Sequence, residues 1–257
     1  AINEDKVNGI LPMCVVATIG TTSSTAVDPV NEISEICAQE NIWLHVDAAY
    51  AGVTAMLPEM KKYFAGIEKA DSIVSNPHKW LFVPIDFSTL YIRKPEVLKR
   101  AFSLSAEYLK TAEDSLAENY MDYGIQLGRR FRALKLWFVI RYFGVEGLRA
   151  RIREHIHIAH QVAKWIDESD TFELLAPTPF STVCFRAKPK TISDESKLNE
   201  LNEKLMNEVN STGKVLLSHT KLNGKFTIRL VVSGLRQEER HAEEAWKLLK
   251  STLAMLV

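Results

Sequence analysis

Apolar runs that alternate with helical stretches constrain the first hundred residues to a sheet of mainly parallel strands. The predicted strands cover residues 13–19, 42–46, 72–74 and 88–92. A helix is expected after Asp28-Pro29, where apolar residues recur at helical spacing. Strands separated by helices pair in parallel, although the direction of the last strand stays open. Because ligands bind at the carboxyl ends of such strands, the residues that follow each run are candidate site residues.

The third predicted strand leads into Ser-Asn-Pro-His-Lys-Trp at positions 75–80. Partial desolvation at a strand end would weaken the preference of Lys79 for its charged form, and a neutral amine attacks an aldehyde. The aldehyde that we predict is pyridoxal phosphate (PLP). The hexapeptide alone is equally compatible with a surface lysine after a proline turn.

The second predicted strand ends in an acid, Asp47, which is followed by small residues. A buried carboxylate requires a cationic partner, and an aspartate on the protonated pyridine nitrogen recurs in PLP sites. Ala48, Ala49 and Gly52 are expected to leave room for the flat ring close to the backbone. Taken alone, Asp47 is also compatible with a helix cap or a turn.

Together and in this order, the two motifs resemble the group II PLP-dependent decarboxylases, most closely those of aromatic L-amino acids. The resemblance extends over nearly the whole chain and includes residues 16–22, 127–132 and 226–230. It implies an α/β protein of the aspartate-aminotransferase-like (type I) fold, a PLP cofactor and a homodimer. The implied reaction converts tryptophan, tyrosine, DOPA or phenylalanine to the amine and CO2. A decarboxylase of acidic substrates such as glutamate, and an inactive folding or dimerisation fragment, remain as alternatives.

The resemblance also implies roles for single residues. Lys79 would hold the cofactor, and Asp47 would keep its ring nitrogen protonated. His78 would contact the cofactor phosphate or the substrate carboxylate, while Asn76 and Thr22 would contact the cofactor. Thr22 is also compatible with a strand-end cap.

Two further positions bear on the reaction and its substrate. Residues 103–123 form a long loop, and Tyr108 within it matches the tyrosine of the family's mobile catalytic loop. That tyrosine protonates the substrate α-carbon, and members with phenylalanine there tend to form aldehydes, so Tyr108 favours amine formation. Tyr108 is also compatible with a residue that only anchors the loop. Gly128 stands where related plant enzymes tend to have glycine for indolic substrates and serine for phenolic ones.

Long helical patterns follow residue 124 and predict a small α+β domain. We assign residues 1–134 to the C-terminal part of the large PLP-binding domain and residues 135–257 to the small domain. One helix is expected to carry Leu127, Phe131, Leu134 and Phe138 and to stop at Gly144. Family members are roughly twice this length, and the phosphate-cradling residues lie in the half before this region. The chain is therefore expected to be a C-terminal portion that requires the N-terminal half, in the same or a separate chain.

Composition agrees with a soluble globular enzyme. The 32 basic and 32 acidic residues leave no basic excess for nucleic acid. No apolar run approaches the length of a membrane span. Cys14 and Cys37 are expected to be buried free thiols, which indicates a reducing, cytoplasmic compartment.

Two clusters of polar residues are weaker candidates for a site. The three histidines between positions 155 and 160 lack the spacing of a helical zinc site, so we predict no metal and expect them to be solvated. The arginines at 129, 130 and 132 are expected to form ion pairs rather than to bind phosphate.

Overall fold

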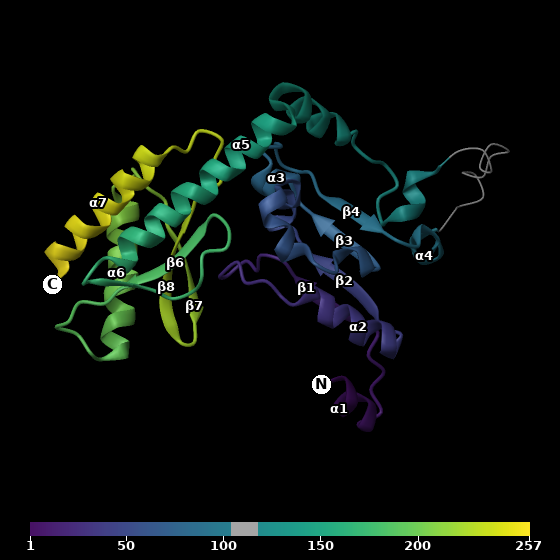
Figure 1. The fold of residues 1–257 in the computed structure, drawn as a ribbon, viewed down its shortest axis with the longest axis horizontal. Coiled ribbons are helices and arrows are strands. Elements are labelled where there is room, and N and C mark those ends of the chain that lie inside the picture. The colour runs from purple at the N-terminus through teal and green to yellow at the C-terminus, as the bar shows by residue number, and fades with distance from the viewer. Residues whose placement is uncertain (104–117) are drawn as a thin grey trace.

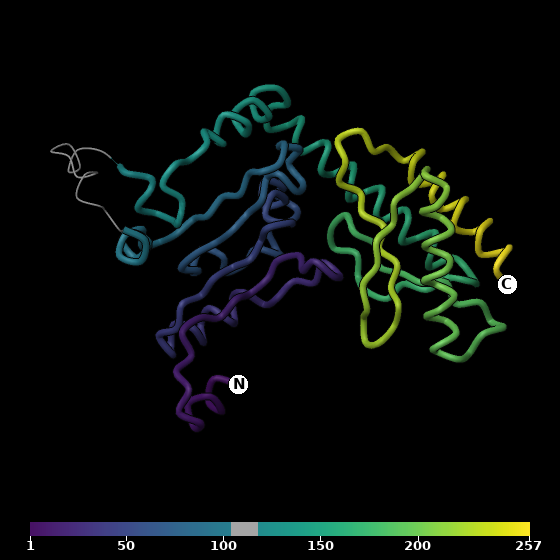
Figure 2. The backbone as a smooth tube through the Cα atoms, turned by 180° about the vertical axis from the view of Figure 1, so that it is seen from behind, coloured from purple at the N-terminus to yellow at the C-terminus, as the bar shows by residue number. Residues whose placement is uncertain are grey.

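The computed structural model describes residues 1–103 and 118–257. In chain order the elements are α1 (Ile2–Val7), β1 (Cys14–Thr18), α2 (Val30–Glu40), β2 (Trp43–Asp47), η1 (Ala51–Met56), η2 (Pro58–Phe64), η3 (Ile67–Lys69), β3 (Ser72–Ser75), α3 (Pro77–Trp80), β4 (Thr89–Ile92), α4 (Pro95–Phe102), η6 (Tyr120–Tyr123), α5 (Ala133–Asp167), β5 (Phe172–Leu174), β6 (Thr182–Ala187), α6 (Glu195–Ser211), β7 (Ser218–Leu222), β8 (Lys225–Val231) and α7 (Glu239–Leu256), where η marks a 3-10 helix. They form two bodies, each with its own sheet, which the long helix α5 joins (Figure 1, Figure 2).

The first sheet has the order β1-β2-β3-β4. The first three strands are parallel, with Thr18 opposite Asp47 and Asp47 opposite Val74. This confirms the predicted α/β class and mostly parallel sheet. The last strand, β4, runs antiparallel to β3, which settles the direction that local sequence left open.

Burial in the first sheet differs from the expectation at β1. Leu44 and Val46 of β2 are fully buried, and Cys37 of α2 packs in the same core. On β1, however, Cys14 is exposed and Val16 is 58% exposed. The prediction of a buried strand with a buried thiol was therefore wrong at these two positions, because β1 is the edge strand in the described part of the chain and only Ala17 is buried along it.

The second body is an antiparallel sheet, β5-β6-β8-β7, packed against helices α5, α6 and α7. Its core includes Phe185, Leu205, Ile228 and Leu249. Arg229 stands on the opposite side of β8 from Ile228 and donates to the Ser23 carbonyl, 3.0 Å away in the loop after β1. Phe226 and Leu230 of β8 lie in the same core as Ile228, and the opposite side of the strand contacts the first body through Arg229.

Helix α5 contributes to both bodies. Leu148 and Ile152 belong to the core of the first body, whereas Val162 and Ile166 belong to the core of the second. The predicted domain boundary between residues 134 and 135 stays a prediction. Among the described residues, no helix is both long and apolar enough to cross a membrane.

The predicted helix before Gly144 is shorter than expected. Helix α5 begins at Ala133, so Leu127 and Phe131 precede it rather than share its face. Gly144 interrupts the helix with φ 65° and ψ 170°, a backbone conformation that essentially only glycine adopts. The expected stop at Gly144 is confirmed as a break between two helical segments.

We expect Gly144→Ala to lower the free energy of unfolding by about 1–3 kcal/mol, because alanine is strained at this φ and ψ. Gly147→Ala is the matched control, since its Cβ would meet only the Phe143 Cβ at an ordinary 3.6 Å. Alanine favours helix over glycine, so the control should gain up to about 1 kcal/mol. Urea unfolding of both variants measures the difference, and equal stability would contradict the strain.

Candidate functional site

The candidate site lies where the parallel strands end, and backbone hydrogen bonds tie the three strand-end loops together. The Ile19 N–H donates to the Asp47 carbonyl at 2.9 Å. The Ala48 N–H donates to the Val74 carbonyl, and the Asn76 N–H donates to the Ala49 carbonyl, each at 3.0 Å. Parallel pairing therefore brings the segments with Thr22, Asp47 and Lys79 to one edge of the sheet.

Asp47 is half-buried, and its carboxylate is oriented by its own loop. Oδ1 accepts a hydrogen bond of 2.9 Å from the Ala49 N–H. Within the described residues, no side chain donates to the Asp47 carboxylate. A fixed carboxylate with one oxygen left over is suited to accept from an external N–H cation.

The small residues after Asp47 serve packing more than the sequence suggested. Ala48 is buried in the core of the first body. A Cβ on Gly52 would lie 2.7 Å from Ser75 Oγ and 3.2 Å from the Ala48 Cβ. Gly52 thus lets η1 approach β3, and the expectation that it also leaves room for a ring stays a prediction. Ala49, at 9% exposure, borders the surface of this edge.

Lys79 lies on α3, a single helical turn directly after β3. Its side chain is exposed, so the expected partial desolvation is not present in the described chain. None of the described residues forms an ion pair or hydrogen bond with its amine. The amine is therefore free to react with a ligand.

Asn76 precedes this turn and His78 lies within it, and both are held by the segment before β4. The Phe87 N–H donates to His78 Nδ1 at 3.0 Å, so Nδ1 is unprotonated and the ring proton lies on Nε2. His78 Nε2 is thus a hydrogen-bond donor, as a contact with phosphate or carboxylate requires. The Asn76 side-chain oxygen, Oδ1, accepts from Ser88 Oγ at 2.6 Å, which leaves the side-chain NH2 group as the remaining donor.

Thr22 is exposed in the turn after β1. The neighbouring Thr21, and not Thr22, caps this turn, because Thr21 Oγ1 accepts from the Ala26 N–H at 3.0 Å. The alternative that Thr22 is a strand-end cap is therefore not supported, and its hydroxyl has no hydrogen bond to the described residues.

Gly128 lines a cavity of about 600 Å³ with Ile85, Asp86, Arg130 and Arg132. Arg132 forms the expected ion pair, 3.0 Å from Asp86, and its hydrogen bond lowers the pKa of that carboxyl. No atom lies within 4 Å of a Cβ built on Gly128, so the described residues leave open space there. Phe87, which follows the cavity-lining Asp86 in the chain, is hydrogen-bonded to His78 of α3. Tyr108 lies outside the described residues.

Sequence reasoning missed an aromatic cluster beside Lys79. Trp80 is fully buried, stacks on Tyr50 with ring centroids 4.9 Å apart, and donates from Nε1 to His155 Nδ1 at 3.0 Å. The Tyr50 hydroxyl lies 2.5 Å from Ser181 Oγ, and burial raises the pKa of Tyr50.

His155 is buried, so the expectation that it is solvated was wrong. The sequence does contain a signal for this burial: His155 follows Ile152 by three residues, which places both on the apolar face of the helix.

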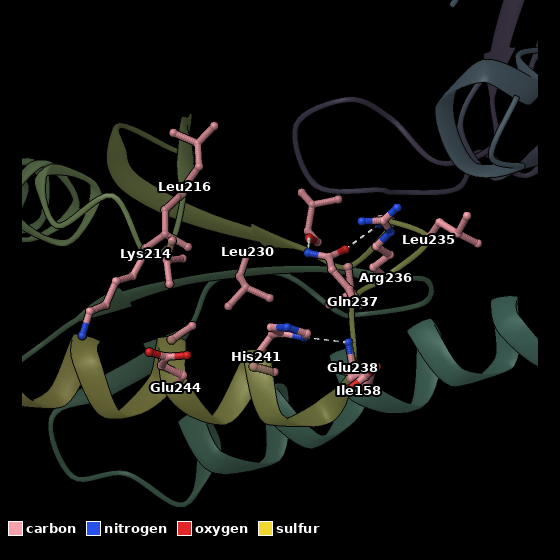
Figure 3. Close-up of a pocket in the computed structure, with 17 residues that line it drawn as sticks. Ile158, Lys214, Leu216, Leu230, Leu235, Arg236, Gln237, Glu238, His241 and Glu244 are labelled. Atoms are coloured by element: carbon pink, nitrogen blue, oxygen red, sulfur yellow. Dashed lines mark hydrogen bonds between the residues drawn. The ribbon is translucent and has the colours of Figure 1, made fainter. Parts of the chain in front are cut away.

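A second cavity, of about 570 Å³, lies in the other body between the end of β8 and α7 (Figure 3). Two of its polar side chains, Gln237 and His241, form hydrogen bonds within the same segment. Gln237 Oε1 accepts from the Gly234 N–H at 2.6 Å, and His241 Nδ1 accepts from the Glu238 N–H at 3.0 Å. It contains none of the predicted site residues. Within residues 1–103 and 118–257, no group of three acidic, histidine or cysteine side chains is arranged to hold a metal.

Comparison with known proteins agrees with this arrangement. Residues 1–188 match the pyridoxal-dependent decarboxylase conserved domain, and the chain belongs to this family. Tryptophan decarboxylase TDC1 of Camptotheca acuminata is 41% identical over 259 residues, which are 100% of this chain and 52% of that protein. Phenylacetaldehyde synthase of Arabidopsis thaliana is 40% identical over 259 residues, 100% of this chain and 53% of that protein.

The crystal structure of Oryza sativa TDC with PLP and tryptamine is similar in fold. It superposes with a TM-score of 0.95 at 39% identity, over 99% of this chain and 53% of that one. The chain thus spans about half the length of the relatives that it matches, and it has their type I fold over that half.

Burial of His155 predicts a pH-dependent stability. Burial and the nearby Arg151 charge lower its pKa from 6.5 to about 4, against a smaller opposing effect of the Gly234 backbone. The unfolded chain therefore binds this proton first, and the contribution of neutral His155 is complete above pH 6.5. It is lost as the pH falls from 6.5 to 4, by up to about 3 kcal/mol.

Urea unfolding between pH 4.5 and 7.5 measures this slope. The control is His155→Gln, which has no titratable group and should show a shallower decline. Carboxylates with lowered pKa values, such as Glu59 beside Arg153, add a decline of their own at lower pH that both proteins share. Identical slopes for the two proteins would contradict the assignment.

Proposed function

We propose that this chain is the C-terminal part of a PLP-dependent decarboxylase that converts aromatic L-amino acids to the corresponding amines and CO2. The observation that carries the proposal is the convergence of Asp47, His78 and Lys79 at one edge of a parallel sheet, in a member of the pyridoxal-dependent decarboxylase family. Relatives named for aromatic substrates or products are 40% and 41% identical to this chain, whereas the glutamate decarboxylase domain of a Vibrio parahaemolyticus protein is 26% identical, which favours aromatic over acidic substrates.

PLP has three groups that a protein must hold: the aldehyde carbon, the pyridine nitrogen and the phosphate. The described residues fit the first two. Lys79 offers an unpaired amine to the aldehyde carbon, and Asp47 offers a fixed carboxylate to the pyridine nitrogen. When bound, PLP supplies an electron sink for the electrons of the bond between the α-carbon and the carboxylate. Asp47 stabilises the protonated ring, and Ala49 borders the same edge. For the phosphate, the described residues offer only Thr22, Asn76 and His78.

His78 has a second role in this proposal. Because its Nδ1 accepts from the Phe87 N–H, Nε2 donates toward whichever anion lies at the strand end. A substrate carboxylate held by this donor is oriented but not neutralised, so it is still able to leave as CO2. Tyr108 is proposed to protonate the α-carbon afterwards, which favours the amine over the aldehyde product of the phenylacetaldehyde synthase relative.

The remaining donors are proposed to come from the N-terminal half of the enzyme, and we propose that the complete enzyme is a homodimer. The same half would cover the exposed side of β1 at Val16 and the exposed apolar residues Leu134, Trp137 and Phe138 of α5. We further propose the division into residues 1–134 of the PLP-binding domain and 135–257 of the small domain, and a cytoplasmic location. Gly128 supports tryptophan, or a broad set of aromatic substrates, because it leaves its cavity open.

Lys79 is expected to be the lysine that PLP modifies in the complete enzyme. Borohydride reduction in the presence of PLP, followed by peptide mapping, should place the pyridoxyl mass on Lys79. Lys79→Ala should abolish both the label and amine release from aromatic amino acids. Lys61→Ala, an exposed lysine on η2, is the control and should change neither. A label on another lysine would sink the assignment.

Asp47→Asn should separate cofactor binding from turnover. The amide keeps the shape and can still accept from the Ala49 N–H, but it removes the charge that favours the protonated ring. We expect PLP to bind more weakly and decarboxylation to fall by roughly 100-fold or more. Absorbance titration with PLP and amine release measure the two effects. Unchanged turnover would mean that Asp47 does not act on the ring.

A further inference from the structure

The short helix that carries Lys79 has little stability of its own. Helix α3 spans only Pro77–Trp80, and isolated helices of one turn do not form in water. Its buried residues are Pro77 and Trp80, and Trp80 is next to Lys79 in the chain. The position of the amine therefore depends on how Trp80 is held.

Trp80 is held from two sides. On one face, Tyr50 stacks on the indole at an angle of 11°. At the edge of the indole, Nε1–H donates to His155 Nδ1 at 3.0 Å, and the planes of the two rings lie within 13° of parallel. Phe82 packs edge-on against His155, with ring centroids 5.8 Å apart, and restricts its rotation.

This bond determines the state of the histidine. An indole nitrogen only donates, so Nδ1 of His155 accepts and the ring proton lies on Nε2. A protonated His155 has no acceptor for Trp80. The lowered pKa of His155 agrees with the neutral form. The bond also connects α3 of the first body with α5, 75 residues later in the chain.

We propose that His155 is a positioning residue of the active site: as the buried acceptor for the Trp80 indole, it fixes the α3 turn and thereby the direction of the Lys79 amine. The proposal rests on the proposed function, in which Lys79 binds PLP. A histidine that merely fills the core would contribute volume, whereas this one contributes an acceptor at a defined atom. The two roles predict different responses to substitution.

The test compares two variants in the complete enzyme. His155→Gln keeps an acceptor oxygen within reach of Trp80, and His155→Leu keeps the apolar volume but removes the acceptor. We expect His155→Leu to lower kcat roughly 10- to 100-fold with little change in KM, because a misplaced reactive group slows the reaction more than it weakens binding. His155→Gln should restore kcat to within about threefold of the parent enzyme.

A second readout does not depend on catalysis. In protein labelled with 15N-tryptophan, the Trp80 indole N–H signal should exchange slowly with solvent in the parent and in His155→Gln, and much faster in His155→Leu. The rate of borohydride labelling of Lys79 at fixed PLP should fall in the same variant. If His155→Leu does not fold, the double variant Trp80→Phe, His155→Leu removes donor and acceptor together and should restore folding.

The outcomes are separable. A folded His155→Leu enzyme with parent kcat and parent labelling rate would overturn the proposal, as would failure of His155→Gln to restore either. A parent enzyme that labels at Lys79 with the expected Trp80 signal, but releases no amine, would contradict the proposed decarboxylation and leave the positioning role intact.

Discussion

Parallel pairing of β2 with its two neighbours is the constraint on which the rest of the site depends. Because Thr18, Asp47 and Val74 lie in register, the three following loops leave the sheet at one edge. The backbone bonds from Ile19 to Asp47 and from Asn76 to Ala49 then fix these loops relative to one another. An acid and an amine that are 32 residues apart in sequence are thus brought to one edge of the sheet by the backbone.

The groups that orient the site residues differ from the groups that are available to a ligand. The Ala49 and Phe87 N–H groups each satisfy one atom of Asp47 and His78, and leave the other atom for a ligand. The hydrogen bond between Trp80 and His155 orients Lys79 by holding the α3 turn that carries it. Backbone donors and one buried pair therefore orient groups that are themselves exposed or half-buried, which is the arrangement that a binding site requires before its ligand arrives.

The two strand-end motifs were predictable from sequence because each combines a local period with a reactive residue at a fixed offset. An apolar run followed by Asp47, or by the turn with Lys79, depends only on neighbours in the chain. Burial, in contrast, depends on contacts between elements that are distant in sequence. Cys14 is exposed because no described strand pairs beyond β1, and His155 is buried because α5 crosses α3. Gly52 is required by Ser75, a contact between η1 and β3 that no local pattern encodes.

The exposure of Lys79 and the exposed apolar side chains have one explanation under the proposed function. A lysine reacts as a neutral amine, and burial is one of the effects that favour that form. The described residues supply the direction of the amine but not its desolvation, just as they supply Asp47 for the ring but few donors for the phosphate. The N-terminal half would then do more than complete a binding surface. By covering the strand-end edge it would also change the chemistry of Lys79, so that orientation and activation of the same residue come from different halves of the enzyme.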